Sequence, residues 1–271
     1  MEIKYVTTTC PYCGSGCAFN LVVKDGKICD VQPSQRARVN EGKLCPKGIF
    51  GWEFIVSPDR LKHPLIKDKA TGEFKEATWE EAIAVIAENF AKYKPDEIAL
   101  ISSARCCNED NYAMQKFARV VLKTPNIDHC ARLCHAPTVA GLNMVFGSGA
   151  STNSFDDLAA ADFVFIIGSN NFEAHPLAGR RIMQAKEKGA HILVCDPRMT
   201  PTAKQAHLHL QHYPGTDIQL LNCLMKQIIE RGWIDEEFVR NRTNGYDDLK
   251  ACVTQDKYSI ENTSVVCGVP A

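Results

Sequence analysis

The sequence has almost no net charge and no long apolar run. Its 271 residues include 31 lysines and arginines against 32 aspartates and glutamates, so the formal net charge is −1. Nothing in that balance favours nucleic acid or an anionic membrane surface as a partner. A membrane-spanning helix needs about 18 uninterrupted apolar residues, and no stretch of the sequence reaches that length. We therefore expect no nucleic-acid partner and no membrane span.

The N-terminal residues also lack the features of a secretory signal. Residues 1–6 contain no apolar signal core, and no twin-arginine pair precedes the first motif. These absences predict a cytoplasmic protein, and disulfides are rare in that compartment. The thirteen cysteines therefore need another use. Metal binding or redox chemistry is the interpretation that we favour for so many thiols.

Four cysteines form a pattern within residues 1–57, which we interpret as a small β-rich domain. Cys10, Cys13 and Cys17 follow C-x2-C-x3-C spacing, and Cys45 comes after a long gap and precedes a proline. Three thiolates on a glycine-containing turn can bind one face of a compact cluster, and a distant fourth can close it, as in a [4Fe–4S] site. A structural zinc site is the alternative, although zinc sites with four cysteines usually pair two C-x2-C units.

The same domain contains a predicted hairpin and a lysine of interest. Residues 19–23 and 27–31 flank a turn at Asp25-Gly26, which is typical of a β-hairpin. Lys47 follows Cys45 by two residues. The sequence supports two interpretations of Lys47 equally. It is either a solvated surface charge, or a charge between the cluster and the next redox group that favours electron density there.

Beyond residue 57 the apolar pattern predicts alternating helices and strands, which is typical of doubly wound α/β architecture. Thr78 and Glu81 form a capping-box pattern at the start of the first helix. The continuous apolar run 161–168 predicts a strand of a parallel sheet covered on both faces. The expected elements are helices at about 78–94, 111–122, 176–188 and 217–231, and strands at 97–101, 161–168, 191–196 and 208–210.

The expected fold class is therefore α/β, a small β-rich [4Fe–4S] domain followed by doubly wound parallel-sheet domains. We divide the chain into the cluster domain (1–57), a first α/β segment (58–129) and a dinucleotide-binding α/β domain (130–271).

Polar side chains follow the predicted parallel strands at their carboxyl ends, where such sheets bind ligands. A strand-end acid such as Asp196 suits ribose or guanine donors, and Arg198 suits a phosphate. A turn capped by Asp196 is the alternative. Several such loops on one sheet edge favour a nucleotide-like ligand. They contribute Asn170, Asn171, Asp196, Arg198, Thr216 and Asp217, and the loop 102–109 lies at the end of another strand.

Cys134 and His135 stand together where a helix is expected to begin. Pro137 suits the first helical turn, because its missing N–H would be unpaired there anyway. A thiol at a helix N-terminus has a lowered pKa, which makes Cys134 a candidate soft metal ligand or nucleophile. His135 can accept or pass a proton near neutral pH. For an isolated pair, a buried and inert cysteine is the alternative.

With these residues together, the chain resembles the molybdopterin oxidoreductases, and among them the catalytic subunits of formate dehydrogenases, most closely the short archaeal type. In those enzymes the place of Cys134 holds cysteine or selenocysteine, and a histidine follows it directly. The motifs that carry the resemblance are C-P-Y-C-x3-C at 10–17, L-C-P-K-G at 44–48, N-Y-x2-Q-K-F-A-R at 111–119, C-A-R-x-C-H at 130–135 and V-C-D-P-R at 194–198.

The resemblance implies the cofactors and the roles of the residues. Cys10, Cys13, Cys17 and Cys45 would bind the [4Fe–4S] cluster. Cys134 would bind molybdenum or tungsten in a bis(molybdopterin guanine dinucleotide) centre. His135 would lie beside the substrate carbon and Lys47 on the electron path, so Cys134, His135 and Lys47 are the expected catalytic residues. The residues expected to contact the dinucleotides are Lys47, Arg105, Gly168, Asn170, Asn171, His175, Asp196, Arg198, Gly215, Thr216 and Asp217.

The reaction implied by the resemblance is oxidation of formate to CO2, or the reverse. Two electrons would pass through the cluster to an iron–sulfur or flavin β subunit, for which deazaflavin reduction is one option. The alternatives are another molybdopterin oxidoreductase, such as a nitrate reductase, and a non-catalytic iron–sulfur electron-transfer subunit of the same fold. The Cys134-His135 pair favours formate. Chains of this family are far longer, so we expect these 271 residues to be the N-terminal portion of an enzyme.

Overall fold

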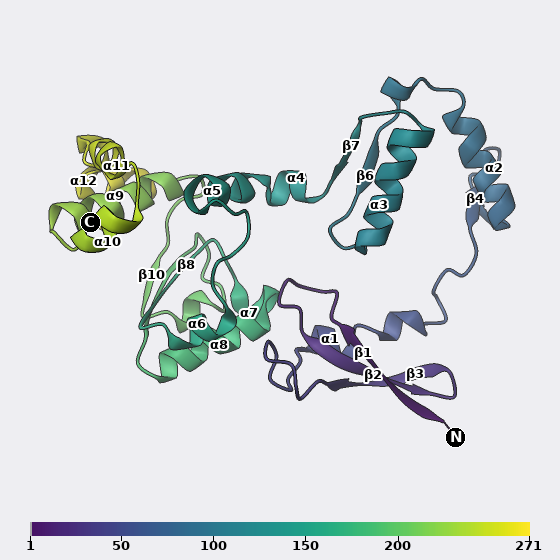
Figure 1. The fold of residues 1–271 in the computed structure, drawn as a ribbon, viewed down its shortest axis with the longest axis horizontal. Helices are drawn as coiled ribbons and strands as arrows, with labels where there is room; N and C mark the ends of the chain where they lie inside the picture. Colours follow the sequence, from purple (N-terminus) through teal and green to yellow (C-terminus); the bar gives the residue numbers. More distant parts are fainter. Residues whose placement is uncertain (1) are drawn as a thin grey trace. The chain divides into compact units, whose positions relative to one another are not determined.

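The computed structural model describes residues 2–271 as a mixed α/β chain (Figure 1). The chain divides into two compact units. The first contains Met1–Tyr12, Phe19–Pro33 and Pro46–Thr152, and the second contains Cys13–Ala18, Ser34–Cys45 and Asn153–Ala271. The α/β class predicted from the sequence is confirmed.

An antiparallel sheet opens the chain, with the strand order β1-β2-β3. Its strands are β1 (Ile3–Thr9), β2 (Ala18–Lys24) and β3 (Lys27–Pro33). Between β2 and β3, Asp25 and Gly26 both have positive φ values, 47° and 80°. A two-residue turn of this kind matches the twist of the strands it joins. The predicted hairpin is confirmed.

The rest of the first unit contains a short hairpin, two parallel strands and several helices. Strands β6 and β7 pair in parallel, and α3 packs beside them (Figure 1). The elements are α1 (Pro46–Phe50), β4 (Leu65–Lys67), β5 (Phe74–Glu76), α2 (Trp79–Phe90), β6 (Leu100–Ser102), α3 (Asn108–Lys116), a π-helical turn (Phe117–Val121), β7 (Ile127–His129), α4 (Ala131–Cys134) and α5 (Ala136–Phe146).

Several predictions for this unit need correction. The capping box of Thr78 and Glu81 is present, but α2 ends at Phe90, before the expected end at about residue 94. Its apolar side chains are not covered, since Ile83 is 60% and Ile86 53% exposed. The expected buried strand 97–101 is a three-residue strand whose Ile101 is 80% exposed. Apolar periodicity identified the apolar face of α2 correctly but could not show what, if anything, covers it.

The second unit is built on the parallel sheet β10-β9-β8. The predicted strands and helices of this region are confirmed to within two residues, and the largest difference is at β8, which begins at Phe163 rather than at residue 161. The elements are α6 (Phe155–Ala160), β8 (Phe163–Ile167), α7 (Asn171–Ala174), α8 (Pro176–Glu187), β9 (His191–Cys195), β10 (Leu208–Leu210), α9 (Asp217–Glu230), α10 (Glu236–Arg242), α11 (Tyr246–Val253) and α12 (Ile260–Cys267).

Two apolar clusters hold this sheet. On one face of the sheet, Ile166 and Val194 pack with Ile182 of α8. On the other face, Cys195 packs with Leu220 of α9 and Cys267 of α12. The second face is covered only in part, because Phe163 is 58% and Phe165 39% exposed. The prediction that strand 161–168 is covered on both faces is therefore wrong for its first half.

A membrane-spanning helix needs about 20 predominantly apolar residues. Within residues 2–271, no helix combines that length with sufficient apolar character.

Candidate metal centre and dinucleotide site

Three of the predicted cluster ligands lie on the connection between β1 and β2. Cys10 follows the last residue of β1, and Cys17 immediately precedes β2. Gly16 has a φ of 68°, a conformation that residues with a side chain rarely adopt, so this glycine is needed for the turn. Cys45 immediately precedes α1. Cys17 is buried, and the other three cysteines are half-buried.

Asn40 joins the segments on either side of the long gap between these cysteines. Its side-chain oxygen accepts a hydrogen bond from the N–H of Ala18 at 3.0 Å. Its nitrogen donates to the carbonyl of Ala18 at 3.1 Å and to that of Lys43 at 2.9 Å. Asn40 is fully buried. No sequence motif identifies Asn40, because its partners are backbone groups.

Arg105, a predicted dinucleotide contact, binds the backbone of the first cysteine motif. Its Nη1 donates to the carbonyl of Tyr12 at 2.7 Å and to that of Pro11 at 3.4 Å. Tyr12 in turn donates its hydroxyl to the carbonyl of Gly51 at 2.6 Å, and the N–H of Gly51 donates to the carbonyl of Lys47 at 2.9 Å. The half-buried Lys47 is thus tied, through its helix, to the segment between Cys10 and Cys13.

Cys134 is the last residue of the short helix α4, and His135 is the N-cap of α5. We expected the thiol to start a helix, so its placement one residue before the N-cap is a correction. Pro137 occupies the first turn of α5, as predicted. Cys134 is exposed, which excludes the alternative of a buried and inert cysteine. An exposed thiol beside an imidazole can reach a ligand.

A cleft of about 470 Å³ lies at the carboxyl ends of the parallel strands β6 and β7. Asp128 lines it, and an ion pair with Arg132 at 2.6 Å holds the pKa of Asp128 below its usual value. The other lining residues are Ser102, Ser103, Ala104, Asn111, Tyr112, Gln115, Ile127 and His129. The loop 102–109 was placed correctly at a strand end, but the sequence did not show which side chains of α3 face it.

Cys130 lies beside this cleft and is an unusual thiol. The N–H of Ala104 donates to its sulfur at 3.4 Å, and the Ser103 hydroxyl is 4.0 Å away. These contacts, the N–H of Ala104 first, lower the pKa of Cys130. In the sequence, Cys130 stands out only as the first residue of the C-A-R-x-C-H motif.

In the second unit, predicted ligand residues lie on adjacent strand ends. Gly168 follows the last residue of β8 and has a φ of 59°, and its N–H donates to the carbonyl of Cys195 at 2.9 Å. The N–H of Asp196 donates to the carbonyl of Leu210 at the end of β10. The predicted sheet edge is therefore continuous across β8, β9 and β10, and it brings Gly168 and Asp196 onto neighbouring strands.

Three of the predicted ligand residues lie on the segment that follows β8. Asn170 accepts a hydrogen bond from the Thr202 hydroxyl at 2.9 Å and donates to Glu173 at 2.6 Å. Asn171 is the first residue of α7, and His175 is the N-cap of α8. Hydrogen bonds from two directions therefore hold the Asn170 side chain.

Asp196 is buried, and its Oδ1 accepts a hydrogen bond from the N–H of Arg198 at 2.8 Å. The turn-capping interpretation of Asp196 is therefore correct in part, since one carboxylate oxygen has that role. An acid with one oxygen committed to a turn still has a second oxygen with which to accept from a ligand.

The loop before α9 places the last three predicted residues. Gly215 has a φ of 83°, and Thr216 is the N-cap of α9. Asp217 accepts from the buried His212 at 3.0 Å when His212 Nε2 carries a proton. Burial, with a smaller contribution from the charge of Asp217, raises the pKa of Cys195 to about 11. Cys195 is thus a core thiol rather than a ligand.

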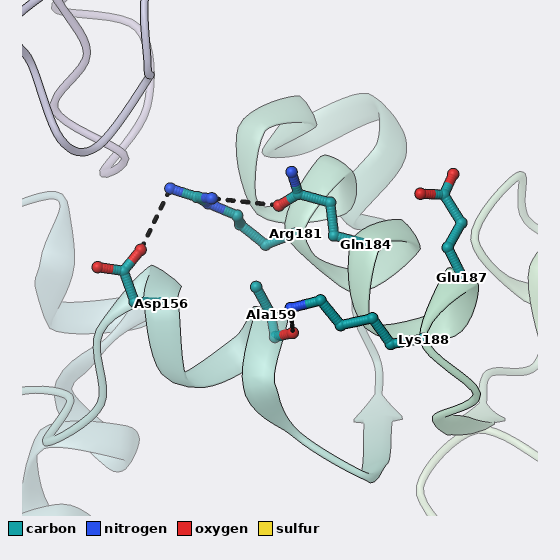
Figure 2. A pocket seen from close by; sticks show the side chains of 6 residues that line it. All are labelled: Asp156, Ala159, Arg181, Gln184, Glu187 and Lys188. Carbon is teal, nitrogen blue, oxygen red and sulfur yellow. Dashed lines mark hydrogen bonds and ion pairs between the residues drawn. The ribbon is translucent and has the colours of Figure 1, made fainter.

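A second cavity, of about 510 Å³, lies between α6 and α8 (Figure 2). Arg181 points toward Asp156 at 3.3 Å, and Lys188 donates to the carbonyl of Ala159 at 3.0 Å. Gln184 and Glu187 complete the lining. None of these is a predicted site residue, and Arg181 and Lys188 already have partners, so this cavity is not the candidate site.

Within residues 2–271, no three histidine, cysteine or acidic side chains are grouped closely enough to hold a metal ion. The fit of the cysteine set to a cluster therefore rests on donor chemistry. Four thiols on turns, one of which needs a left-handed glycine, are the soft ligands that iron–sulfur clusters require. The residues fit that group.

Comparison with known families agrees with this geometry. Residues 60–263 match the model of the molybdopterin oxidoreductases, and residues 3–57 match the model of the molybdopterin oxidoreductase Fe4S4 domain. The chain belongs to the molybdopterin oxidoreductase family. These matches confirm the two predicted cofactor classes, a [4Fe–4S] cluster and a molybdenum or tungsten molybdopterin.

Individual relatives are formate dehydrogenases. The chain is 57% identical over 270 residues to "F420-dependent formate dehydrogenase 2 subunit alpha" of Methanococcus maripaludis, covering 100% of this chain and 39% of that one. The "F420-dependent formate dehydrogenase subunit alpha" of Methanocaldococcus jannaschii is 56% identical, with 99% and 39% coverage. "Formate dehydrogenase H" of Escherichia coli is 41% identical, with 99% and 38% coverage. The chain thus spans about two fifths of the length of these relatives.

Among solved structures, acetylene hydratase from Pelobacter acetylenicus superposes with a TM-score of 0.79. It covers 97% of this chain, and this chain covers 37% of it, at 24% sequence identity. At that identity the likeness establishes the fold alone.

Proposed function

We propose that the protein acts in a formate dehydrogenase, as the part of the catalytic subunit that binds the cluster and the metal. The reaction is oxidation of formate to CO2, or its reverse. The observation that carries the proposal is the exposed Cys134 immediately before the His135 N-cap of α5, in a chain 57% identical to a formate dehydrogenase α subunit. A soft ligand and a proton acceptor are thus neighbours.

The proposed role of Cys134 is to donate its thiolate to molybdenum or tungsten, which suits a soft sulfur ligand. When bound, the metal–pterin centre supplies a two-electron acceptor. His135 would take the proton of the formate C–H bond at an imidazole nitrogen, the general-base role that histidine side chains most often have in catalysis. Helix α5 begins directly after the pair, because the N–H of Val139 already donates to the carbonyl of His135 at 2.9 Å. The positive end of that helix favours the formate anion.

The proposed electron path leads through the [4Fe–4S] cluster, held by Cys10, Cys13, Cys17 and Cys45. We assign Lys47 to the region between cluster and pterin. Its helix is held to the Tyr12 segment by Gly51, which supports a fixed position. A positive charge there favours the reduced state of a neighbouring redox group.

The proposed dinucleotide contacts are the strand-end groups of the second unit and Arg105 of the first. Glycines with positive φ allow close approach of the backbone to a phosphate. The residues assigned to this role are Lys47, Arg105, Gly168, Asn170, Asn171, His175, Asp196, Arg198, Gly215, Thr216 and Asp217.

The electrons must leave the cluster, so we propose a partner subunit that carries a flavin or iron–sulfur centre. The two archaeal relatives named F420-dependent support deazaflavin as the final acceptor. We place the reaction in the cytoplasm, where many reduced thiols are maintained.

The test is elemental analysis together with formate-dependent dye reduction by the protein purified anaerobically with its cofactors. We expect about four irons per chain, as a [4Fe–4S] cluster requires, together with molybdenum or tungsten. His135→Leu should keep the metals and lose formate oxidation, and His63→Leu, at an exposed loop position, should keep both. Unchanged turnover in His135→Leu would assign another substrate, and zinc without iron would refute the cluster.

A further inference from the structure

The turn formed by Asn40, Glu41 and Gly42 (the 40–42 turn) lies on the segment that leads to Cys45. Glu41 and Gly42 have positive φ values of 46° and 68°. A glutamate rarely adopts such a conformation, so interactions of its neighbours or of its side chain must hold it there. The fully buried Asn40 and the carboxylate of Glu41 both have such interactions.

Asn40 binds both segments that carry cluster ligands in the second unit. It is hydrogen-bonded to both backbone groups of Ala18, the residue after Cys17, at 3.0 and 3.1 Å. Its second N–H binds the carbonyl of Lys43, two residues before Cys45, at 2.9 Å. The Asn40 amide thus uses both N–H donors and its oxygen. Together these bonds fix the backbone next to Cys17 and the backbone near Cys45.

Glu41 ties the same turn to helix α8. Arg180 donates to one carboxylate oxygen at 2.6 Å and Arg181 to the other at 2.7 Å. The Arg181 side chain is only 5% exposed and also pairs with Asp156, as Figure 2 shows. These contacts, led by the hydrogen bond from Arg180, keep the pKa of Glu41 below its usual value. The turn is therefore anchored on helix α8 as well as on the backbone of Ala18.

We propose that Asn40 is a positioning residue of the [4Fe–4S] cluster, and that Glu41 supports it by holding the 40–42 turn. Asn40 sets the separation between the backbones that bear Cys17 and Cys45. A cluster of fixed size accepts its fourth thiolate only if that separation is right. Outer partners of this kind commonly change metal affinity by about 10- to 100-fold. The proposal rests on the proposed set of four cysteine ligands.

The test compares variants of the protein purified anaerobically with its cofactors. Asn40→Asp keeps the size of the side chain and its acceptor, but it places a carboxylate against the carbonyls of Ala18 and Lys43. Asn40→Ala removes all three bonds. We expect both variants to lose iron to a chelator at least about 10-fold faster than the unmodified protein. The electron paramagnetic resonance spectrum and midpoint potential of the reduced cluster should also shift.

Three further variants keep the test decisive. Asn20→Ala removes an amide of β2 whose oxygen accepts a hydrogen bond from the Thr7 hydroxyl at 2.8 Å, and it should leave all readouts unchanged. Glu41→Gln alters an exposed residue, so it should fold even if the Asn40 variants do not. Its chelator rate should lie between those of the unmodified protein and Asn40→Ala. Cys45→Ser tests the ligand set itself and should lose the native cluster signal.

Two results would overturn the proposal, and they are distinguishable. Unchanged spectra, potentials and chelator rates in folded Asn40 variants, with a lost cluster in Cys45→Ser, would refute the positioning role alone. If the Asn40 variants do not fold, an unchanged chelator rate in Glu41→Gln has the same meaning. A native cluster in Cys45→Ser would refute the ligand set on which the proposal rests.

Discussion

The hydroxyl of Tyr12 donates to the carbonyl of Gly51 at 2.6 Å, and Gly51 has no room for a side chain on that side. A Cβ at Gly51 would meet the Tyr12 ring and the carbonyl of Lys47. Tyr12, which lies between Cys10 and Cys13, is therefore packed against the C-terminal end of α1, the helix that follows Cys45. Gly51 is therefore required by a close contact with Tyr12. The sequence around Gly51 does not show this contact, because Tyr12 is distant in the sequence.

Gly51→Ala should therefore destabilise the protein. The added methyl group must push aside an aromatic ring and a backbone carbonyl, so we expect a loss of about 1–3 kcal/mol in the free energy of unfolding. Urea unfolding followed by circular dichroism measures it. Gly141→Ala is the matched control, because Gly141 lies within α5 and a Cβ there meets nothing within 4 Å. That variant should be neutral or stabilising by up to about 1 kcal/mol. Equal stability of the two variants would contradict the close packing.

The capping box of α2 gives a prediction for a helix that is mostly exposed. The Thr78 hydroxyl accepts from the N–H of Glu81 at 3.2 Å, and the Glu81 carboxylate accepts from the N–H of Thr78 at 2.8 Å. With little packing to support α2, its cap is a large part of what holds the first turn. Thr78→Ala should cost about 1 kcal/mol of stability, whereas Thr78→Ser should be close to neutral. Amide exchange of the first turn distinguishes them, and equal protection in both would show that the cap is unimportant.

Asp68 predicts the behaviour of the β4–β5 hairpin in acid. Lys75 at 2.6 Å, followed by the N–H groups of Ala70 and Thr71, lowers the pKa of Asp68 below 3.8. The folded state therefore releases this proton more readily than the unfolded state. The resulting stabilisation is present above pH 3.8 and is lost as the pH falls through the lower folded pKa. Asp68→Asn should make urea midpoints less dependent on pH in this window.

The same experiment has an internal control. Lys75→Gln removes the largest cause of the shift but keeps the two backbone donors. Its acid dependence should lie between those of the unmodified protein and Asp68→Asn. Identical profiles for all three proteins would mean that Asp68 has no part in the acid response.

Local chemistry explains which parts of this fold could be predicted. Asp25 and Gly26, two consecutive residues with positive φ, form the β2–β3 turn. The cap of α2 needs only Thr78 and Glu81. The alternation of apolar strands and helices in the second unit is a local pattern as well. All of these were identified correctly, since each depends on residues a few positions apart.

Contacts between distant residues explain the rest. The coverage of β8 depends on where α9 and α12 pack, so the exposure of Phe163 could not be derived from its own strand. The short helix α4 begins at Ala131, and no capping signal in the sequence marks that start. Cys134 therefore lies at the end of a helix that the sequence did not predict. The role of Asn40 requires Ala18 and Lys43 to be brought together, and no motif spans that distance.

Two thiols with opposite pKa shifts give a final prediction. Burial raises the pKa of Cys195 to about 11, whereas the N–H of Ala104 and the Ser103 hydroxyl help to lower that of Cys130. At pH 8 a thiol with a pKa of about 11 is ionised in only about one molecule in a thousand. Iodoacetamide reacts with the thiolate, so the folded, metal-free protein should be alkylated at the exposed Cys130 while Cys195 is spared.

Peptide mass spectrometry over time measures the alkylation rates of Cys130 and Cys195. Ser103→Ala should slow the reaction of Cys130 and leave Cys195 unchanged, and in urea the two thiols should react alike. Alkylation of both thiols at one rate in the folded protein would contradict the environments described for them.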